Sequence, residues 1–287
     1  MELEKIIIIP DVHGRTFWEE PVNKYKNVVG VHIVFLGDYL DAYKDIDGIE
    51  AEDAIANFEK IIETARSSNN ITLLLGNHDL HYWDEFLPYR GCRRYELYKQ
   101  DINNMFMKNI DLFSIAHETY INNKQYLFTH AGVLVKWFGW VTGKLNRGTI
   151  DKPYYFKDFI EYFTKHPDGP LEKFIADNES IDLLNIELNA NGLNSLLNSC
   201  IGRFALSMVG RDRGGYDYVS SCLWCDVSEH YWANSRFDAN NLYQIFSHSF
   251  GFPSLNEYVI NDEWAMLDCR KAFELDCKTG TIKEYTN

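Results

Sequence analysis

Long hydrophobic runs are missing from this sequence of 287 residues. Its apolar stretches are short and interrupted by charge, whereas a membrane-spanning helix needs roughly 18 to 20 consecutive apolar residues. The opening residues, Met1 to Lys5, lead directly into an apolar run and lack the pattern of a signal peptide. We therefore expect a cytoplasmic protein that has no membrane partner.

Basic residues are also scarce. The sequence has 28 lysines and arginines against 42 acidic residues, and its formal net charge is −14 at pH 7. A protein that binds duplex nucleic acid needs a broad basic face. We therefore do not expect a nucleic acid duplex as a partner.

The six cysteines do not have the dense spacing of a disulfide framework, which suits a reducing compartment. Cys222 and Cys225 form a CxxC sequence. Without a second pair they would make a poor zinc site, so we expect ordinary, half-buried thiols. Repeats, low-complexity tracts and linkers are also missing, and 46% hydrophobic residues suffice for a buried core.

Against these absences stand five short polar motifs, each of which follows an apolar run that is typical of a strand. The motifs are Asp11-Val12-His13-Gly14, Gly37-Asp38-Tyr39-Leu40-Asp41, Gly76-Asn77-His78-Asp79, Thr129-His130-Ala131-Gly132 and Ser247-His248-Ser249. In open α/β sheets, ligands bind in the crevice beyond the carboxyl ends of the strands. We therefore expect the five motifs to meet in one pocket.

The rest of the chain indicates a single α/β domain over residues 1–287. Apolar residues recur three and four positions apart from Ala51 to Ala65, which predicts an amphipathic helix between two strands. The first 80 residues therefore form a β-α-β-α-β unit with parallel strands and right-handed crossovers. Residues from about 137 to 207 are interpreted as a mostly helical cap or insertion, after which the chain returns to strands.

The side chains of the motifs suit a pair of metal ions. Carboxylate, imidazole and neutral amide groups are ligands of divalent or trivalent Mn, Fe or Zn. Asp11 and His13 should face one metal, because residues two apart point the same way in extended backbone. The two oxygens of Asp38 could bridge to a second metal roughly 3.5 to 4 Å away. Asn77 would add a ligand without charge, which leaves the pair positive enough to activate a bridging water.

His78 directly follows Asn77, so its side chain should point away from this ligand and toward the substrate. We predict that it acts as a general acid. Asp41 could accept a hydrogen bond from one ring nitrogen of His78, fix its tautomer and favour its protonated form. The other nitrogen could then protonate a leaving alkoxide. Histidines outside the five motifs are interpreted as surface or packing residues.

The motifs resemble those of the calcineurin-like metallophosphoesterase superfamily, in its branch of phosphoprotein phosphatases and bacterial diadenosine tetraphosphatases. The matching residues are Asp11, His13, Asp38, Asn77, His78, His130 and His248. This resemblance implies a four-layer α/β/β/α sandwich with a dimetal centre at its rim. It also implies one metal held by Asp11, His13 and Asp38, and another held by Asp38, Asn77, His130 and His248.

Two departures from the superfamily pattern bear on the substrate. Many phosphodiesterases of the superfamily end in G-H-x-H, whereas Ser249 and Phe250 follow His248 here, which fits the phosphatase branch. Phosphoprotein phosphatases read G-D-x-x-D-R-G, where the arginine grips substrate phosphate. This chain has Ala42 and Tyr43 in place of that Arg-Gly pair.

Another arginine could therefore bind the substrate phosphate. Arg213 lies in an Asp-Arg-Gly-Gly sequence that resembles a phosphatase stretch, and its planar bidentate donor suits phosphate oxygens. Arg15, beside the first motif, is the second candidate. The structural alternative for either residue is a surface arginine.

The principal hypothesis is a dimetal phosphoesterase that hydrolyses phosphomonoesters by attack of metal-bound hydroxide, in the manner of serine/threonine protein phosphatases. Its substrate would be a phosphorylated protein or a small phosphate ester. The alternative is a bis(5'-nucleosyl)-tetraphosphatase (diadenosine tetraphosphatase), because residues 76–81 resemble that group and the many aromatic side chains could stack adenine. A catalytically silent binding module is disfavoured, because buried carboxylates and histidines without metal would be costly.

Overall fold

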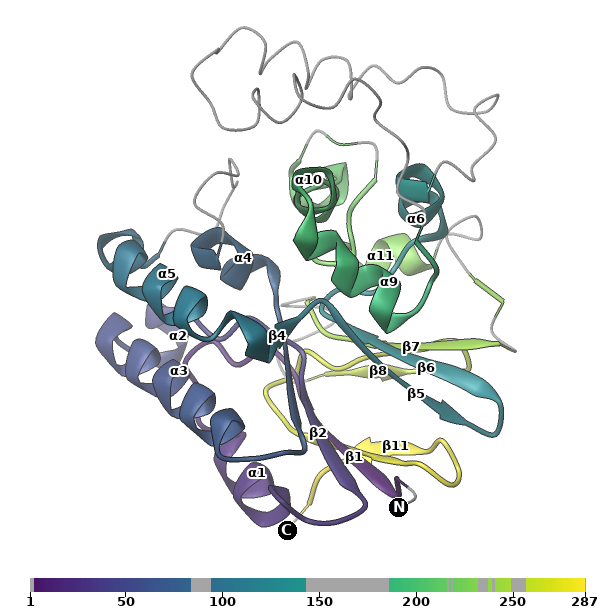
Figure 1. Ribbon diagram of the computed structural model, residues 1–287, viewed down its shortest axis with the longest axis horizontal. Coiled ribbons are helices and arrows are strands. Elements are labelled where there is room, and N and C mark those ends of the chain that lie inside the picture. The colour runs from purple at the N-terminus through teal and green to yellow at the C-terminus, as the bar shows by residue number, and fades with distance from the viewer. Residues whose placement is uncertain are drawn as a thin grey trace, which may run out of the picture.

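The computed structural model describes residues 3–83, 94–142, 186–215, 217, 219–231, 237–238, 241–248 and 257–286. Over these residues, two β-sheets pack face to face and helices cover their outer faces (Figure 1). This arrangement gives the predicted α/β/β/α layers. Most of the predicted cap, residues 143–185, lies outside the described residues, and the single-domain organisation stays a prediction.

The first sheet has the strand order β11-β10-β1-β2-β3-β4. Its strands are Lys5–Ile9 (β1), Val31–Phe35 (β2), Ile71–Leu74 (β3), Phe113–Ser114 (β4), Phe273–Asp276 (β10) and Ile282–Glu284 (β11). Strands β1 to β4 are parallel, and β10 and β11 add an antiparallel edge. The predicted β-α-β-α-β start is therefore confirmed.

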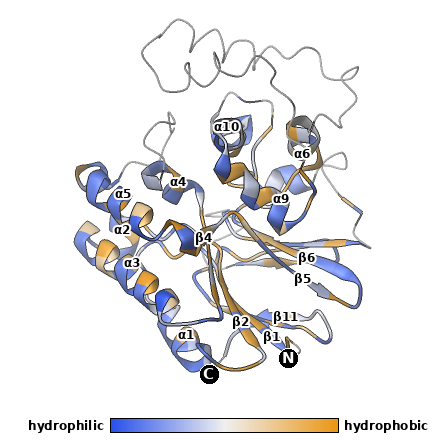
Figure 2. Ribbon diagram, in the orientation of Figure 1, coloured by the Kyte–Doolittle hydropathy of each residue, from blue (hydrophilic) through white to orange (hydrophobic). Residues whose placement is uncertain are grey.

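Helices of the first 110 residues lie along the outer face and upper rim of this sheet (Figure 1). They are Glu19–Tyr25 (α1), Lys44–Asp47 (α2), Ala51–Arg66 (α3), Asn77–Trp83 (α4) and Lys99–Lys108 (α5), with short 3-10 turns at Glu96–Tyr98 (η1) and Ile110–Leu112 (η2). The longest, α3, buries Ala54, Phe58, Ile61, Ile62 and Ala65 on one face. Figure 2 shows the resulting split between an apolar and a polar side of this helix. The amphipathic helix predicted from the sequence is confirmed.

The second sheet has the order β5-β6-β7-β9-β8. Its strands are Ala116–Ile121 (β5), Lys124–Thr129 (β6), Leu242–Phe246 (β7), Val259–Ile260 (β8) and Trp264–Met266 (β9). Strands β6, β7 and β9 are parallel, whereas β5 and β8 are antiparallel edges. Its helical elements are Val135–Thr142 (α6), Ala190–Ser195 (α9), Leu196–Asn198 (η3), Cys200–Leu206 (α10), Arg211–Arg213 (η4) and Val227–His230 (α11). In Figure 1 these helices lie over the face turned away from the first sheet.

Strand β1 shows why a run of four isoleucines suits this architecture. Ile7 and Ile9 pack into the core beneath the helices, whereas Ile6 and Ile8 pack between the two sheets. All four are fully buried, because parallel strands covered on both faces expose neither side to water. Burial of each such side chain contributes roughly 1.5 to 3 kcal/mol before the entropy cost of folding.

The CxxC cysteines differ from the expectation of half-buried thiols. Cys222 and Cys225 are both fully buried, because their segment packs beneath the loop that follows β6. The backbone N–H of Ala131 in that loop donates to the carbonyl of Cys222 at 2.8 Å. Burial raises the pKa of Cys225 well above its usual value, so its thiol stays protonated. These cysteines act as packing groups in the core.

Two histidines outside the motifs form a stacked pair between the sheets. The rings of His32 on β2 and His117 on β5 are parallel within 9°, with centroids 4.6 Å apart. His32 Nε2 lies 2.8 Å from the hydroxyl of Thr72, which ties the pair to β3. Burial, and after it the charge of His32, lower the pKa of His117 to about 3. The pair is therefore neutral in the folded protein at neutral pH.

This pair should make the protein sensitive to mild acid. Below the ordinary histidine pKa of about 6.5, the unfolded chain binds a proton at His117 that the folded chain does not bind until about pH 3. The free energy of unfolding should therefore fall with pH, and His117 should account for roughly 2 kcal/mol of loss at pH 5. We expect His117→Phe to reduce the difference in stability between pH 7 and pH 5 in urea titrations. A pH dependence identical to that of the wild type would contradict this assignment.

Candidate metal centre

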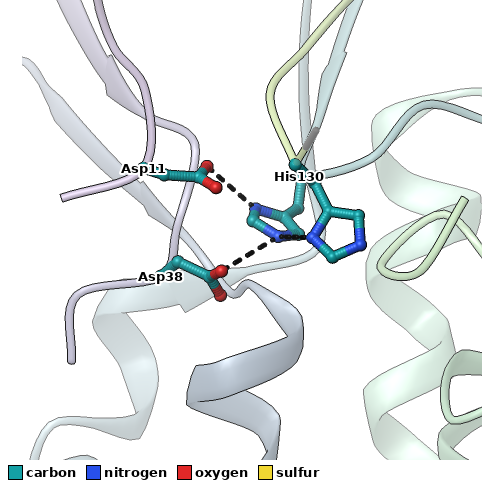
Figure 3. Close-up of side chains that lie close together, drawn as sticks. Asp11, Asp38 and His130 are labelled. Carbon is teal, nitrogen blue, oxygen red and sulfur yellow. Dashed lines mark hydrogen bonds and ion pairs between the residues drawn. The ribbon is translucent and has the colours of Figure 1, made fainter. Parts of the chain in front are cut away.

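The five motifs meet at one rim of the two sheets, as predicted. Backbone hydrogen bonds hold their loops together: His13 N donates to Asp38 O at 2.7 Å, and Ser247 N donates to His130 O at 2.7 Å. The hydroxyl of Ser247 also donates to the carboxylate of Asp11, which links the last motif to the first. In Figure 3, the carboxylates of Asp11 and Asp38 point across the rim toward the His130 imidazole.

One group of ligand atoms comes from Asp11, Asp38, His130 and His248, which are all buried and lie within 4.8 Å of one another. His130 Nε2 is 3.1 Å from His248 Nδ1 and 2.9 Å from Asn77 Oδ1. His130 Nδ1 lies 2.8 Å from the carbonyl of Leu36 and donates to it, which leaves Nε2 as the lone-pair nitrogen of a neutral ring. The lone pair of His130 Nε2 thus faces the amide oxygen of Asn77, an arrangement that a cation would stabilise.

A second group consists of His13, Asp38 and His78. His13 Nε2 is 3.5 Å from Asp38 Oδ2 and 4.0 Å from Asp11 Oδ2. Among the described residues, Asp38 is the member common to both groups, which matches the position expected of a bridging ligand. The resemblance assigns Asp11 to the same metal as His13. In the structure, Asp11 belongs to the first group of ligand atoms, and its Oδ2 is also 4.0 Å from His13 Nε2 in the second group.

Electrostatics at the centre favour bound cations. Burial raises the pKa of Asp38 well above its usual value, and the charge of Asp11 adds to this rise. Burial also lowers the pKa values of His13, His130 and His248. The imidazoles are therefore neutral and keep a free lone pair, while the carboxylates repel each other. Cations held by these groups would remove that repulsion, so the donor set fits two metal ions.

Several site residues have a backbone conformation that side chains rarely adopt. The φ angles of His13, Asp38, Asp41 and His248 are 45°, 52°, 57° and 64°. Such left-handed conformations cost of the order of 1 to 3 kcal/mol each in non-glycine residues and cluster at functional sites. The ligands therefore reach the centre through strained turns. The extended backbone that the sequence analysis expected between Asp11 and His13 is not present, because His13 is left-handed.

Asp79 holds the strained turn of Asp38 in place. Its carboxylate accepts hydrogen bonds from the backbone N–H groups of Asp38, Tyr39 and Gly76 at 2.7, 2.9 and 2.8 Å. Burial raises the pKa of Asp79 to about 7, although the three donors favour its charged form. Gly37 completes the turn, since a Cβ at this position would lie 2.5 Å from Gly76 N. The sequence placed Asp79 in a motif but gave it no role.

His78 and Asp41 form the hydrogen bond that the sequence suggested. His78 Nδ1 lies 2.8 Å from Asp41 Oδ2, and the hydroxyl of Tyr82 donates to Asp41 Oδ1 at 2.5 Å. Burial alone would raise the pKa of Asp41, but the hydrogen bonds from His78 and Tyr82 lower it below its usual value. Asp41 is therefore a charged acceptor that orients the imidazole. No motif or spacing in the sequence indicated a role for Tyr82.

Both arginines predicted to grip phosphate are paired with carboxylates. Arg213 Nη2 donates to the carbonyl of His248 at 2.5 Å, and its Nε lies 3.0 Å from Asp226 Oδ2. Arg15 donates twice to Asp47, at 3.1 and 2.9 Å. The same Asp47 carboxylate also pairs with Arg270 at 3.1 Å. Arg213 is thus hydrogen-bonded to the backbone of the ligand candidate His248, and Arg15 forms a partly buried ion pair beside the first motif.

No helix in the described part of the chain is long and apolar enough to cross a membrane.

A search of curated proteins found no match. Similar solved structures include a protein serine/threonine phosphatase from Saccharomyces cerevisiae, with 14% identity, 100% of this chain and 81% of that chain covered, and a TM-score of 0.44. A putative diadenosine tetraphosphatase has 13% identity, coverage of 99% and 93%, and a TM-score of 0.40. A dimetal phosphatase from Danio rerio has 10% identity, coverage of 99% and 96%, and a TM-score of 0.39.

The family comparison is more informative than these distant structural similarities. The model of the calcineurin-like phosphoesterase family matches residues 4–199, which is more than half of the chain. The match includes the first four motifs, and His248 lies beyond it. The chain therefore belongs to the calcineurin-like phosphoesterase family and is a metal-dependent hydrolase of phosphate esters.

Proposed function

We propose that the protein is a dimetal-dependent phosphomonoesterase whose substrates, like those of serine/threonine phosphatases, have an alkoxide leaving group. The observation that carries this proposal is the oriented His78–Asp41 pair, which adjoins the residue common to both ligand groups. His78 Nε2 lies 3.9 Å from Asp38 Oδ2, while its Nδ1 is held by Asp41. An alkoxide needs a proton as it leaves, and this pair can supply one.

The residues that would hold the metals are Asp11, Asp38, Asn77, His130 and His248 on one side and His13 with Asp38 on the other. We propose Mn, Fe or Zn, since these accept mixed oxygen and nitrogen ligands. When bound, two such cations lower the pKa of a water and polarise a phosphoryl oxygen. Asp38 keeps the two sites adjacent, and its turn is fixed by Asp79.

His78 would act on the opposite side of the substrate phosphorus from the attacking water. Asp41 accepts from Nδ1 and stabilises the protonated ring, so the proton on Nε2 is the one available to the leaving oxygen. Tyr82 occupies the other oxygen of Asp41 and prevents that carboxylate from turning away. We propose Arg213 as a positioning residue for the His248 loop, because its guanidinium is held by the His248 carbonyl and by Asp226. Its contact with substrate phosphate stays a prediction from the sequence.

Hydrolysis of a dinucleoside tetraphosphate is the alternative function. The sequence from Gly76 to His81 suggested it, but in the structure Asp79 and His81 are buried and bond within the protein. The leaving group of a tetraphosphate is moreover a phosphate anion, which needs little help from an acid. The His78–Asp41 pair therefore favours monoesters. Side-by-side hydrolysis of a phosphopeptide and a dinucleoside tetraphosphate tests the choice, and a strong preference for the dinucleotide would reverse it.

The bridging position of Asp38 leads to a prediction on metal content. Asp38→Asn keeps the shape of the side chain but removes its charge and one oxygen ligand. We expect the purified variant to lose metal from both sites, and its turnover of 4-nitrophenyl phosphate to fall further than that of His130→Ala. Elemental analysis beside steady-state kinetics provides the measurement. A variant that holds two metals and turns over normally would exclude the bridge.

The role of His78 leads to a prediction on leaving groups. We expect His78→Asn to retain its metals but to lose on the order of 10²-fold or more in kcat for alkyl phosphates, the usual scale of general acid catalysis. The loss should shrink for 4-nitrophenyl phosphate, whose leaving group needs no proton. Tyr82→Phe should show the same trend with a smaller loss, because it removes only one support of Asp41. An equal loss on both substrates would remove His78 from the acid role.

A further inference from the structure

Arg94 lies against the turn that contains Asp41, although the two residues are distant in sequence. Its Nη1 donates to the backbone carbonyl of Asp41 at 2.5 Å. Its guanidinium carbon lies 4.0 Å from the centre of the Tyr43 ring, which is within the range of a cation–π contact. These two contacts fix both the position and the plane of the guanidinium group.

The backbone next to Arg94 is anchored to the same turn. The hydroxyl of Tyr95 accepts from the backbone N–H of Ala42 at 2.9 Å, and the N–H of Tyr95 donates to the hydroxyl of Tyr82 at 3.1 Å. Tyr95 is buried, whereas Arg94 is exposed. The chain thus presents Arg94 at the surface from a backbone fixed to Ala42 and to the tyrosine that supports Asp41.

A short row of rings connects Arg94 to the centre. Tyr43 meets the His13 ring edge-on at a centroid distance of 5.1 Å, and His13 meets His78 edge-on at 5.0 Å. The guanidinium of Arg94 therefore lies next to the ring that contacts a ligand candidate, and it is bonded to the backbone of the residue whose carboxylate orients the acid.

Arg94 differs from the other arginines near the centre in its partners. Arg15 and Arg270 pair with Asp47, and Arg213 pairs with Asp226. Within the described residues, no carboxylate forms an ion pair with Arg94. A guanidinium has five N–H donors, and hydrogen bonds to the Asp41 carbonyl and to the Tyr43 side chain do not neutralise its charge. Arg94 therefore keeps N–H donors that can donate to an anionic oxygen of a ligand at the centre.

We propose that Arg94 binds a non-bridging phosphoryl oxygen of the substrate and thereby selects dianionic monoesters over monoanionic diesters. This inference rests on the proposed phosphomonoesterase function. A monoester has one more charged oxygen than a diester with the same leaving group, and a charge-assisted hydrogen bond to that oxygen strengthens as charge develops in the transition state. Ala42 stands where phosphoprotein phosphatases carry the arginine that grips phosphate, and its side chain has no hydrogen-bond donor. Arg94 would supply this phosphate contact instead.

The test compares 4-nitrophenyl phosphate with bis(4-nitrophenyl) phosphate, which share one leaving group. We expect Arg94→Ala to lower kcat/KM roughly 10-fold or more for the monoester and about 2-fold or less for the diester. The inhibition constant of inorganic phosphate should rise by a factor similar to the monoester loss, while metal content stays unchanged. Arg94→Lys should recover part of the loss, and so should guanidinium ion added to Arg94→Ala.

Arg66→Ala is the matched control: Arg66, the last residue of α3, forms an exposed ion pair with Asp111, so its loss should not change the ratio of monoester to diester hydrolysis. Equal losses on both substrates, loss of metal from Arg94→Ala, or a selective monoester loss in Arg213→Ala or Arg15→Ala instead would overturn the proposal. Calorimetric binding of inorganic phosphate to the metal-loaded protein gives a readout independent of turnover. If the wild type hydrolyses neither ester, the proposed function fails, and the Arg94 assignment is decided by whether Arg94→Ala weakens phosphate binding.

Discussion

The mutual repulsion of buried donor groups around Asp38 is the constraint on which the rest of the site depends. Carboxylates of Asp11 and Asp38 and ring nitrogens of His130 and His248 converge within a few ångströms and away from water. In a protein interior such a set is unfavourable unless cations occupy it. Folding and metal binding should therefore be coupled, because the ions supply the attraction that the protein alone lacks.

The surrounding scaffold holds these groups together against that repulsion. The parallel strands of the two sheets bring their carboxyl ends to one rim, and the turns beyond them adopt left-handed conformations at His13, Asp38 and His248. Asp79 bonds to three backbone N–H groups of the central turns and fixes their shape. The strain at the ligands is thus offset by core packing and by the hydrogen bonds that the Asp79 carboxylate accepts.

Much of this could be predicted from the sequence, because strand and helix periodicities and the ligand motifs are local patterns. The isoleucine strand, the amphipathic α3 and the convergence of the five motifs all follow from spacing. Arg94 could not be found in this way, since nothing near it in the sequence indicates a contact with Asp41. The reason given for pairing Asp11 with His13 was wrong, because His13 has a φ of 45° and the backbone there is not extended. Tertiary contacts decide both cases.

The overall charge of the protein and the charge of its site act over different distances. A net charge of −14 would repel a phosphate dianion, but at physiological ionic strength the Debye length is about 8 Å, so distant surface carboxylates are largely screened. Attraction and selection must therefore come from groups at the centre itself. Arg15 and Arg213 have carboxylate partners there, and their positive charge is largely matched. Discrimination between phosphate esters then depends on the metal pair, on the proton of His78 and on the guanidinium of Arg94.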